Sequence, residues 1–133
     1  MNIFLDSSFL IAYAIEIDAH YNRAIELDDE GIFINDCYIS NLVINEVITV
    51  VGNKSSFDIA IQLFDVIKDN CTILNEFELS NFNNIVINEY SKHNGKLSFT
   101  DSSISVLMKN YNLQKIVSFN KDFDRIDHIS RIY

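Results

Sequence analysis

The sequence predicts an α/β domain in which a mostly parallel central sheet lies between two layers of helices. Short apolar segments of strand length alternate with longer segments whose apolar residues recur at helical spacing. The chain has 133 residues, 48% of them hydrophobic, which suits a single domain (1–133) with one continuous core. It has no proline and only three glycines, so few positions favour a linker. Alternating strands and helices favour a parallel sheet covered on both faces, a three-layer α/β/α arrangement.

The first half of the chain predicts two strands and four helices. The expected strands are 2–5 and either 32–34 or 37–39. The expected helices are 7–14, 18–30, 42–51 and 57–67. Gly31 and Gly52 are expected to end two of these helices, since glycine is common just after a helix C-terminus. Serines or an asparagine precede the third and fourth helices, where they favour N-capping.

The second half predicts two clear strands, two helices and one further edge strand. The expected strands are 71–74, 115–118 and, at the edge, 128–133. One expected helix has its apolar positions at Leu79, Phe82, Val86 and Tyr90 and ends near Asn94 and Gly95, and a second begins around Thr100 and Asp101. In the latter helix Ile104, Leu107 and Met108 share one face. Residues 119–123 are expected to form a loop at the end of strand 115–118.

Charge is distributed unevenly along the chain. The net charge is −9, which argues against broad electrostatic adhesion to nucleic acid. Residues 1–95 hold 4 basic and 15 acidic side chains, whereas residues 96–133 hold 6 basic and 4 acidic ones. If a polyanion binds, its expected supports are therefore the basic residues of the last third: Lys96, Lys109, Lys115, Lys121, Arg125 and Arg131. An ordinary solvated surface explains the same pattern equally well.

Other compositional features indicate a cytoplasmic protein without a membrane segment. The N-terminus has no basic region, and Asp6 interrupts any apolar signal segment, so secretion is not expected. No apolar run approaches the roughly 18 residues that a membrane span needs. Cys37 and Cys71 form no CxxC pair and are expected to be small buried residues rather than a disulfide or metal site. The three histidines are scattered, which argues against a zinc enzyme.

Acidic residues occur where α/β proteins gather their ligands. Asp6 follows the first strand, and the loop with Asn120 and Asp122 follows a later one. Glu46 lies at the margin of the apolar arc of its helix, and Asp101 lies near a helix N-terminus. Each has a purely structural alternative: the aspartates favour helix caps, and Glu46 can point into water.

Convergence of these side chains at one sheet edge would predict a metal site. Two unit charges about 4 Å apart at an effective dielectric of about 20 repel by roughly 4 kcal/mol. A divalent cation makes such a cluster tolerable, and oxygen-only ligands favour Mg²⁺ or Mn²⁺.

Taken together, these segments resemble a PIN-domain ribonuclease of the VapC toxin type over nearly the whole chain. The matching segments are 5–11, 18–20 with Ala24, 44–47, 97–101 and 118–123. The family's acids correspond to Asp6, Glu46 and Asp101, and its Ser/Thr before the last acid corresponds to Ser118. The family pattern resembles Thr-Phe-Asp-Lys-Asp-Phe in the last segment, so Asn120 replaces its fourth acid. Asn120 retains an amide oxygen, and Asp122 is expected to supply the missing charge.

The resemblance implies hydrolysis of RNA phosphodiester bonds with the help of Mg²⁺ or Mn²⁺. Asp6 and Asp101 would be primary ligands, and Glu46 would bind directly or through water. Residues expected to support the ligands are Ser7, Thr100, Ser118 and Asn120, and RNA contacts are expected from Lys121 and Arg125. A small antitoxin and a homodimer are the partners that the resemblance implies.

Two other classes of protein are consistent with the sequence. The first is a degenerate PIN module that binds RNA or a protein without cleavage, which Asn120 favours. The second is a phospho-acceptor receiver-like domain of similar length. A receiver should show adjacent acids after its first strand and a lysine at the end of its last parallel strand. This chain has the single Asp6 and, at the later position, Ser118 and Phe119.

Overall fold

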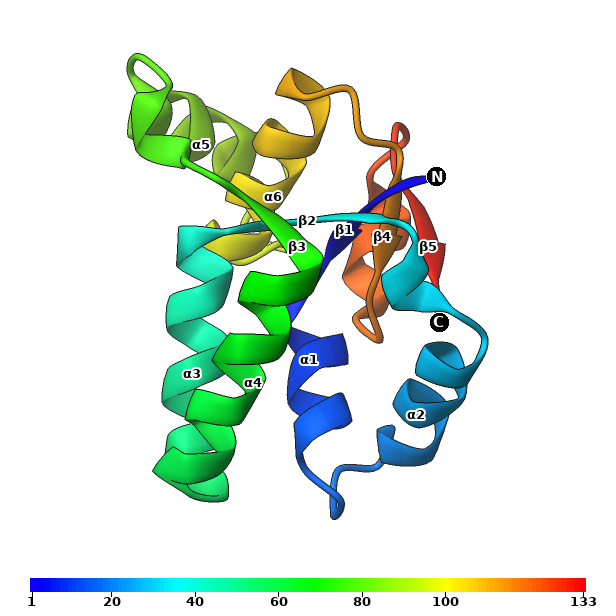
Figure 1. Cartoon of the computed structure of the whole chain (residues 1–133). Helices are drawn as coiled ribbons and strands as arrows, with labels where there is room; N and C mark the ends of the chain where they lie inside the picture. Colours follow the sequence, from blue (N-terminus) through cyan, green and yellow to red (C-terminus); the bar gives the residue numbers. More distant parts are fainter.

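The computed structural model describes all residues, 1–133, and contains a five-stranded sheet with helices on both sides. The strands are β1 (Asn2–Leu5), β2 (Asp36–Ser40), β3 (Cys71–Leu74), β4 (Lys115–Val117) and β5 (Ser130–Ile132). The helices are α1 (Ser7–Ala14), α2 (Tyr21–Asp29), α3 (Asn41–Lys54), α4 (Phe57–Asn70), α5 (Phe82–Lys92) and α6 (Phe99–Asn110). Short 3-10 turns are η1 (Ile32–Ile34), η2 (Glu76–Glu78) and η3 (Lys121–Arg125). In Figure 1, α5 and α6 lie above the strands and α1 to α4 lie below them, which confirms the three-layer prediction.

All neighbouring strands are parallel, in the order β3-β2-β1-β4-β5. The central strand β1 pairs on both sides, so that Ile3 is opposite both Cys37 and Lys115. Because every strand runs the same way, the residues that follow β1, β2 and β4 meet at one sheet edge. Receiver-like domains have the order 2-1-3-4-5, so this topology argues against the receiver alternative.

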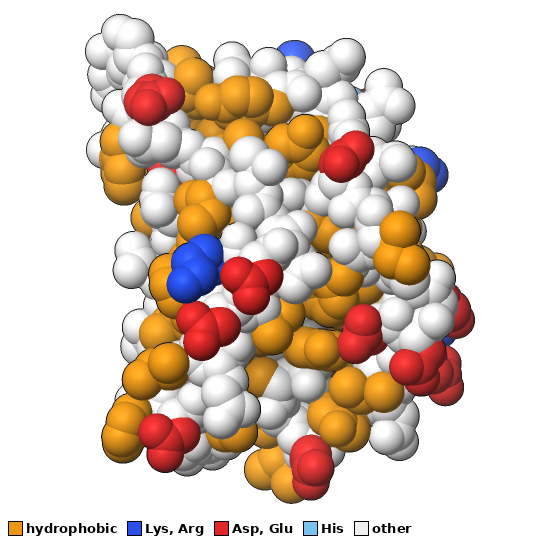
Figure 2. Space-filling view, in the orientation of Figure 1, with side chains coloured by type: hydrophobic (Ala, Val, Ile, Leu, Met, Phe, Trp, Pro, Cys, Tyr) orange, Lys and Arg blue, Asp and Glu red, His pale blue; other side chains and the backbone are white.

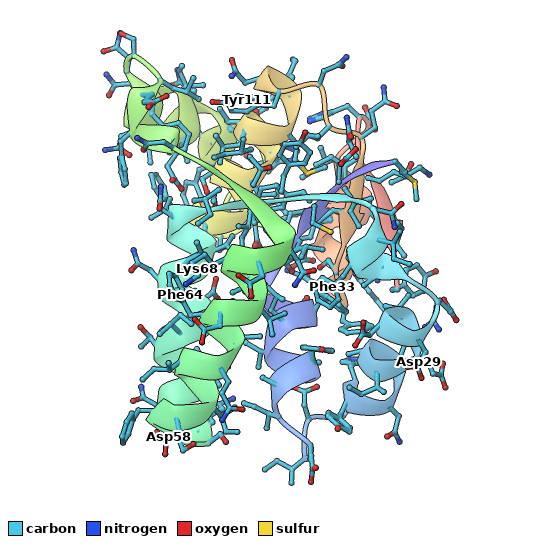
Figure 3. The ribbon with its side chains drawn as sticks, viewed as in Figure 1. Asp29, Phe33, Asp58, Phe64, Lys68 and Tyr111 are labelled. Atoms are coloured by element: carbon cyan, nitrogen blue, oxygen red, sulfur yellow. The ribbon has the colours of Figure 1, made fainter.

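The buried side chains form one continuous core around the sheet. Ile3, Phe4 and Leu5 are fully buried, as expected for a central parallel strand covered on both faces. Phe9 and Tyr13 of α1 pack against Phe33, with ring centroids 5.9 and 5.4 Å apart. Figure 3 shows Phe33 between η1 and α1. This aromatic group fixes α1, and therefore the chain around Asp6, against the start of β2.

Several predicted elements differ in their limits from the observed ones; α4 runs to Asn70, α5 spans Phe82–Lys92 and β5 spans only Ser130–Ile132. Three further differences have a clear local cause. Residues 32–34 form the turn η1, and β2 is the alternative segment that includes 37–39. Gly31 ends the preceding helix as predicted, in the left-handed region (φ 93°). Gly52 does not end α3, which continues to Lys54 because an interior glycine costs less than the packing around Val51 contributes. α2 begins at Tyr21 rather than near Asp18, since the Asp18 carboxylate accepts the His20 N–H in a turn.

The surface is mainly acidic and carries exposed apolar side chains. The face in Figure 2 shows several acidic groups, one large basic group on its left side at mid-height and apolar side chains between them. Phe57 and Ile61 of α4 are 71% and 55% exposed. No helix combines the length and the apolar character that crossing a bilayer would require.

Candidate active site

Asp6 lies at the carboxyl end of β1, at the entrance to α1. It occupies the N-cap position of α1, but its side chain makes no capping hydrogen bond. Its Oδ2 instead accepts hydrogen bonds from the hydroxyls of Ser118, at 2.6 Å, and Ser8, at 2.8 Å. The residue is only 3% exposed. The helix-cap alternative is therefore not what positions this carboxylate; two serine hydroxyls hold it.

Ser8 and Ser118 connect Asp6 to the loop that follows β4. The Ser8 hydroxyl accepts the N–H of Phe119 at 2.9 Å, and the Ser118 hydroxyl accepts the N–H of Asn120 at 3.0 Å. Ser7 lies close to the other oxygen of Asp6, with Oγ 3.5 Å from Oδ1. Sequence reasoning named Ser7 and Ser118 as supporting residues but missed Ser8. Ser8 and Ser118 share one carboxylate oxygen because β1 and β4 are paired, with Leu5 opposite Val117.

Asp101 lies in the first turn of α6. Ser98, not Thr100 or Asp101, caps this helix, and its hydroxyl accepts the N–H of Asp101 at 3.0 Å. Burial, followed by the negative charge of Asp6, raises the pKa of Asp101 from 3.8 to about 6, with Ser98 acting in the opposite direction. The Glu46 charge adds a smaller increase. Thr100 contributes its main-chain oxygen to Ser103.

Glu46 projects from α3 toward the same acids. The residue is exposed overall, yet partial burial of its carboxyl group raises its pKa above 4.5. Ser7 opposes this shift by hydrogen bonding, and the nearby charge of Asp6 adds to it. The charge of Asp6 therefore acts on both Glu46 and Asp101, and the charge of Glu46 acts on Asp101.

Asn120 lies against Asp101. Its Nδ2 donates to Oδ2 of Asp101 at 3.2 Å, and its Oδ1 accepts the N–H of Asp122 at 3.0 Å. The amide oxygen that was expected to face a cation is thus used to shape the turn η3. The amide nitrogen faces the acidic group instead.

Asp122 does not join the acidic group through any hydrogen bond. Its carboxylate faces Arg125, with Oδ1 3.6 Å from Nε, and both side chains are about half exposed. The prediction that Asp122 replaces the missing fourth acid therefore has no support in this geometry. The ion pair with Arg125 accounts for its position.

The predicted basic supports are divided among several surfaces. Lys121 lines a cavity with Phe119, next to the acidic site, whereas Arg125 lines another one with Lys92 and Lys109. The Arg131 side chain is 5% exposed and forms two hydrogen bonds with Asp124. Arg131 therefore joins β5 to η3 and has a structural role.

The donor set fits a hard divalent cation. Asp6, Glu46 and Asp101 offer carboxylate oxygens alone. The charge of Asp6 helps to raise the pKa of both Glu46 and Asp101, and a bound cation would oppose that effect. As placed, no three His, Cys, Asp or Glu side chains form a closed metal-binding group. The acids thus lie near one another at one sheet edge, but they do not form a complete coordination site.

Several solved structures share this fold. VapC20 of Mycobacterium tuberculosis, described as a toxin that cleaves the sarcin-ricin loop, has a TM-score of 0.82 and 19% identity, over 94% of this chain and 95% of its own. VapBC2 of Rickettsia felis, bound to a DNA fragment from its promoter, has a TM-score of 0.70 and 16% identity, over 99% and 98%. DNA-bound VapBC of Salmonella typhimurium has a TM-score of 0.67 and 14% identity, over 99% and 97%.

No curated protein sequence matches the chain significantly. The sequence profile of the PIN domain does match it, over residues 3–129. That match spans nearly the whole chain, and the observed fold is the one that VapC structures share. The chain therefore belongs to the PIN domain family.

Proposed function

We propose that this protein is a metal-dependent endoribonuclease and the toxin of a toxin–antitoxin pair. The observation that carries the proposal is the approach of Asp6, Glu46 and Asp101 from three separate elements to one edge of a PIN-domain sheet. The similar structures support it, since they include a toxin that cleaves the sarcin-ricin loop and two VapBC complexes.

Asp6, Asp101 and Glu46 would hold the cation, and Asp122 has no part in this proposal. A bound Mg²⁺ or Mn²⁺ would polarise the phosphoryl oxygen and lower the pKa of a bound water. The protein's own contribution is to fix the ligands. Ser8 and Ser118 hold the Asp6 carboxylate in one orientation by donating to Oδ2. Asn120 holds Asp101 in the same way from its amide nitrogen.

Glu46 is suited to a different task from the two aspartates. It is the most exposed of the three acids, and its raised pKa makes it a better proton acceptor than an ordinary glutamate. We assign to its carboxylate the orientation of the attacking water, whose proton it can accept at an oxygen. Two serine hydroxyls hold Oδ2 of Asp6, whereas Ser7 alone hydrogen-bonds to the Glu46 carboxylate.

The test is cleavage of a mixed RNA pool in Mg²⁺, in Mn²⁺ and in chelator. Wild-type protein should cleave with either metal and not in chelator, and Asp101→Asn should lose at least a hundredfold in rate if it removes a principal ligand. Asp58→Asn, on α4, removes the same charge from an exposed position and should cleave normally. Cleavage that persists in chelator or in Asp101→Asn would refute the metal mechanism.

Asn120 favours a second candidate, a PIN module that binds without cleaving. An amide stands where the family pattern has an acid, and its nitrogen rather than its oxygen faces Asp101. Binding of RNA by the wild type, with no cleavage in either metal and none restored by Asn120→Asp, would favour this candidate.

The partners in this proposal are an RNA substrate, a small antitoxin and a second copy of the chain in a cytoplasmic homodimer. Co-expression with the product of the adjacent gene tests the antitoxin: a stable complex should form and inhibit cleavage. Light scattering of the purified chain tests the dimer. A monomer across micromolar concentrations would exclude it.

A further inference from the structure

A cavity of about 270 Å³ lies next to the acidic site. Its walls come from α2, the loop after β4 and the C-terminal strand, and its lining residues are His20, Arg23, Phe119, Lys121, Arg131 and Tyr133. All six are aromatic or basic, although the chain has a net charge of −9. Figure 1 shows α2 near the C-terminus, and Arg23 donates to the main-chain oxygen of Tyr133.

One wall of the cavity is a stacked pair of rings. The imidazole of His20 lies parallel to the Phe119 ring, with centroids 4.5 Å apart and planes 9° apart. Phe119 is fixed from behind by Phe9, at 6.4 Å, and by its N–H bond to Ser8. His20 itself is exposed. A rigid, exposed ring of this kind suits stacking by a further flat group.

Of the lysine and arginine side chains that line the cavity, two form ion pairs within the protein and one does not. Arg23 pairs with Glu26 and Glu30. Arg131 is held by Asp124 and lies 3.8 Å above the Tyr133 ring. Lys121, by contrast, is exposed and has no ion pair within 4.0 Å. Lys121 is therefore the charge available to an anionic ligand.

The cavity is joined directly to the acidic residues. Phe119 lies between Ser118, which donates to Asp6, and Asn120, which donates to Asp101. A ligand on the His20–Phe119 stack is thus held by the same loop that positions both aspartates. This arrangement suits a polymeric substrate that is bound through one of its residues and cleaved at the adjacent bond.

We propose that this cavity is a nucleobase subsite that receives the base of an unpaired nucleotide beside the bond to be cleaved. The base stacks on His20, and Lys121 contacts its phosphate. The inference rests on the proposed function in taking RNA as the substrate, and it restricts that substrate to single-stranded segments, whose bases are free to stack on a side chain. An acidic peptide would satisfy Lys121 but has no flat face for the ring pair.

Proton NMR of the wild-type protein in chelator tests the stacking. Adding AMP or UMP should shift the His20 ring protons by the ring current of the base, whereas ribose 5-phosphate should leave them in place. Equal shifts with ribose 5-phosphate, or shifts with a hexaglutamate peptide and none with AMP, would overturn the proposal. The peptide result would assign the cavity to an acidic protein segment.

Variants of His20 test the same point on RNA. His20→Ala should weaken binding of a single-stranded RNA octamer, measured in chelator, by roughly 5- to 150-fold, the usual range for losing one stacked base. His20→Tyr keeps a ring and should restore most of the affinity. Phe57→Ala removes an exposed ring from α4, away from the cavity, and should have no effect. Equal affinities of His20→Ala and wild type would refute the subsite.

The two proposals fail separately in these experiments. A wild type that binds AMP through His20 but cleaves no RNA would refute the nuclease and keep the base subsite. A wild type that cleaves RNA, with His20 unmoved by any nucleotide, would refute the subsite and keep the nuclease.

Discussion

Asn120 lowers the electrostatic repulsion within the acidic site when no metal ion is bound. A carboxylate at this position would meet Asp101 as a like charge, whereas the amide nitrogen donates to Oδ2 of Asp101 at 3.2 Å. At the same time Oδ1 caps the turn η3 through the N–H of Asp122. One residue therefore stabilises the metal-free arrangement of both the loop and the acid.

Asn120→Asp should have opposite effects on folding and on metal binding. The turn keeps one oxygen as its cap, but the other oxygen faces Asp101, so we expect a loss on the order of 1 to 3 kcal/mol in chelator. The added charge should tighten Mn²⁺ binding and enlarge the metal-induced rise in Tm. Thermal melts with and without Mn²⁺ measure both. Asp122→Asn, which breaks only the exposed pair with Arg125, should change stability by less than about 1 kcal/mol. Unaltered metal binding in Asn120→Asp would show that position 120 does not act on the site.

Asp101 should make metal-free stability fall as the pH rises. Burial and then the charge of Asp6 raise its pKa from 3.8 to about 6 in the folded chain, so the folded state binds this proton more tightly than the unfolded state. The resulting stabilisation is complete below about pH 4 and is lost as the pH rises to about 6. Partial exposure screens the effect, so we expect on the order of 1 kcal/mol.

Urea unfolding in chelator at pH 4 and pH 6.5 measures this loss. Other carboxylates also titrate, so wild type must be compared with Asp101→Asn. The unfolding free energy of Asp101→Asn should decrease less between pH 4 and pH 6.5 than that of wild type. Asp58→Asn should leave the wild-type decrease unchanged. A wild type and Asp101→Asn with the same pH dependence would contradict the raised pKa.

At the scale of elements, α3 is capped by a residue from another part of the chain. Glu76 is fully buried, and its two carboxylate oxygens accept the N–H groups of Asn41, at 2.9 Å, and Leu42, at 3.0 Å. Ser40 accepts the N–H of Val43 from within the helix's own segment. The start of α3 is thus fixed by η2, and with it the direction in which Glu46 projects.

Glu76→Ala should destabilise the protein by about 2 to 4 kcal/mol, because two partly buried helix N–H groups and the Asn41 side chain lose their acceptor. Glu76→Gln keeps the size and one acceptor, so we expect a smaller loss of about 1 to 2 kcal/mol. Urea unfolding measures both. Glu78→Ala, an exposed neighbour in η2, should stay within about 0.5 kcal/mol of wild type. Equal stabilities for Glu76→Ala and Glu78→Ala would mean that the cap does not hold α3.

At the scale of the whole molecule, metal binding should be coupled to folding. The proposed ligands lie just after β1, in α3 and in α6, so only the folded chain brings them together. A cation that binds only the folded state stabilises it by about 2.7 kcal/mol when the free cation concentration is about 100 times Kd.

Glu46→Gln is the variant that isolates this coupling. It removes one charge without disturbing the hydroxyls that hold Asp6, so Tm in chelator should rise and the Mn²⁺-induced increase should shrink. Asp58→Asn should keep the full Mn²⁺ increase. Identical increases in wild type and Glu46→Gln would show that Glu46 does not take part in binding.

The sequence by itself determined the alternation of strands and helices, and with it the parallel sheet. Strand 71–74 and the Ser40 and Ser56 caps were predictable because they depend on residues near in sequence. The same reasoning led us to expect Asp6, which follows a strand, near Glu46 and Asp101, which lie on helices that follow polar turns. Their predicted roles rest on the family resemblance and stay proposals.

Only the tertiary structure decided which groups hold those acids. Most of these hydrogen bonds join residues that are distant in sequence: Ser118 to Asp6, Asn120 to Asp101, and the start of α3 to Glu76. The bond from Ser8 to Asp6 is local, but it forms only in particular side-chain rotamers. Periodicity reports which face of an element is buried, but it carries no information about which partner a side chain meets across the fold. For the same reason the stack of His20 on Phe119 has no sequence signal, because it exists only where α2 passes the loop after β4.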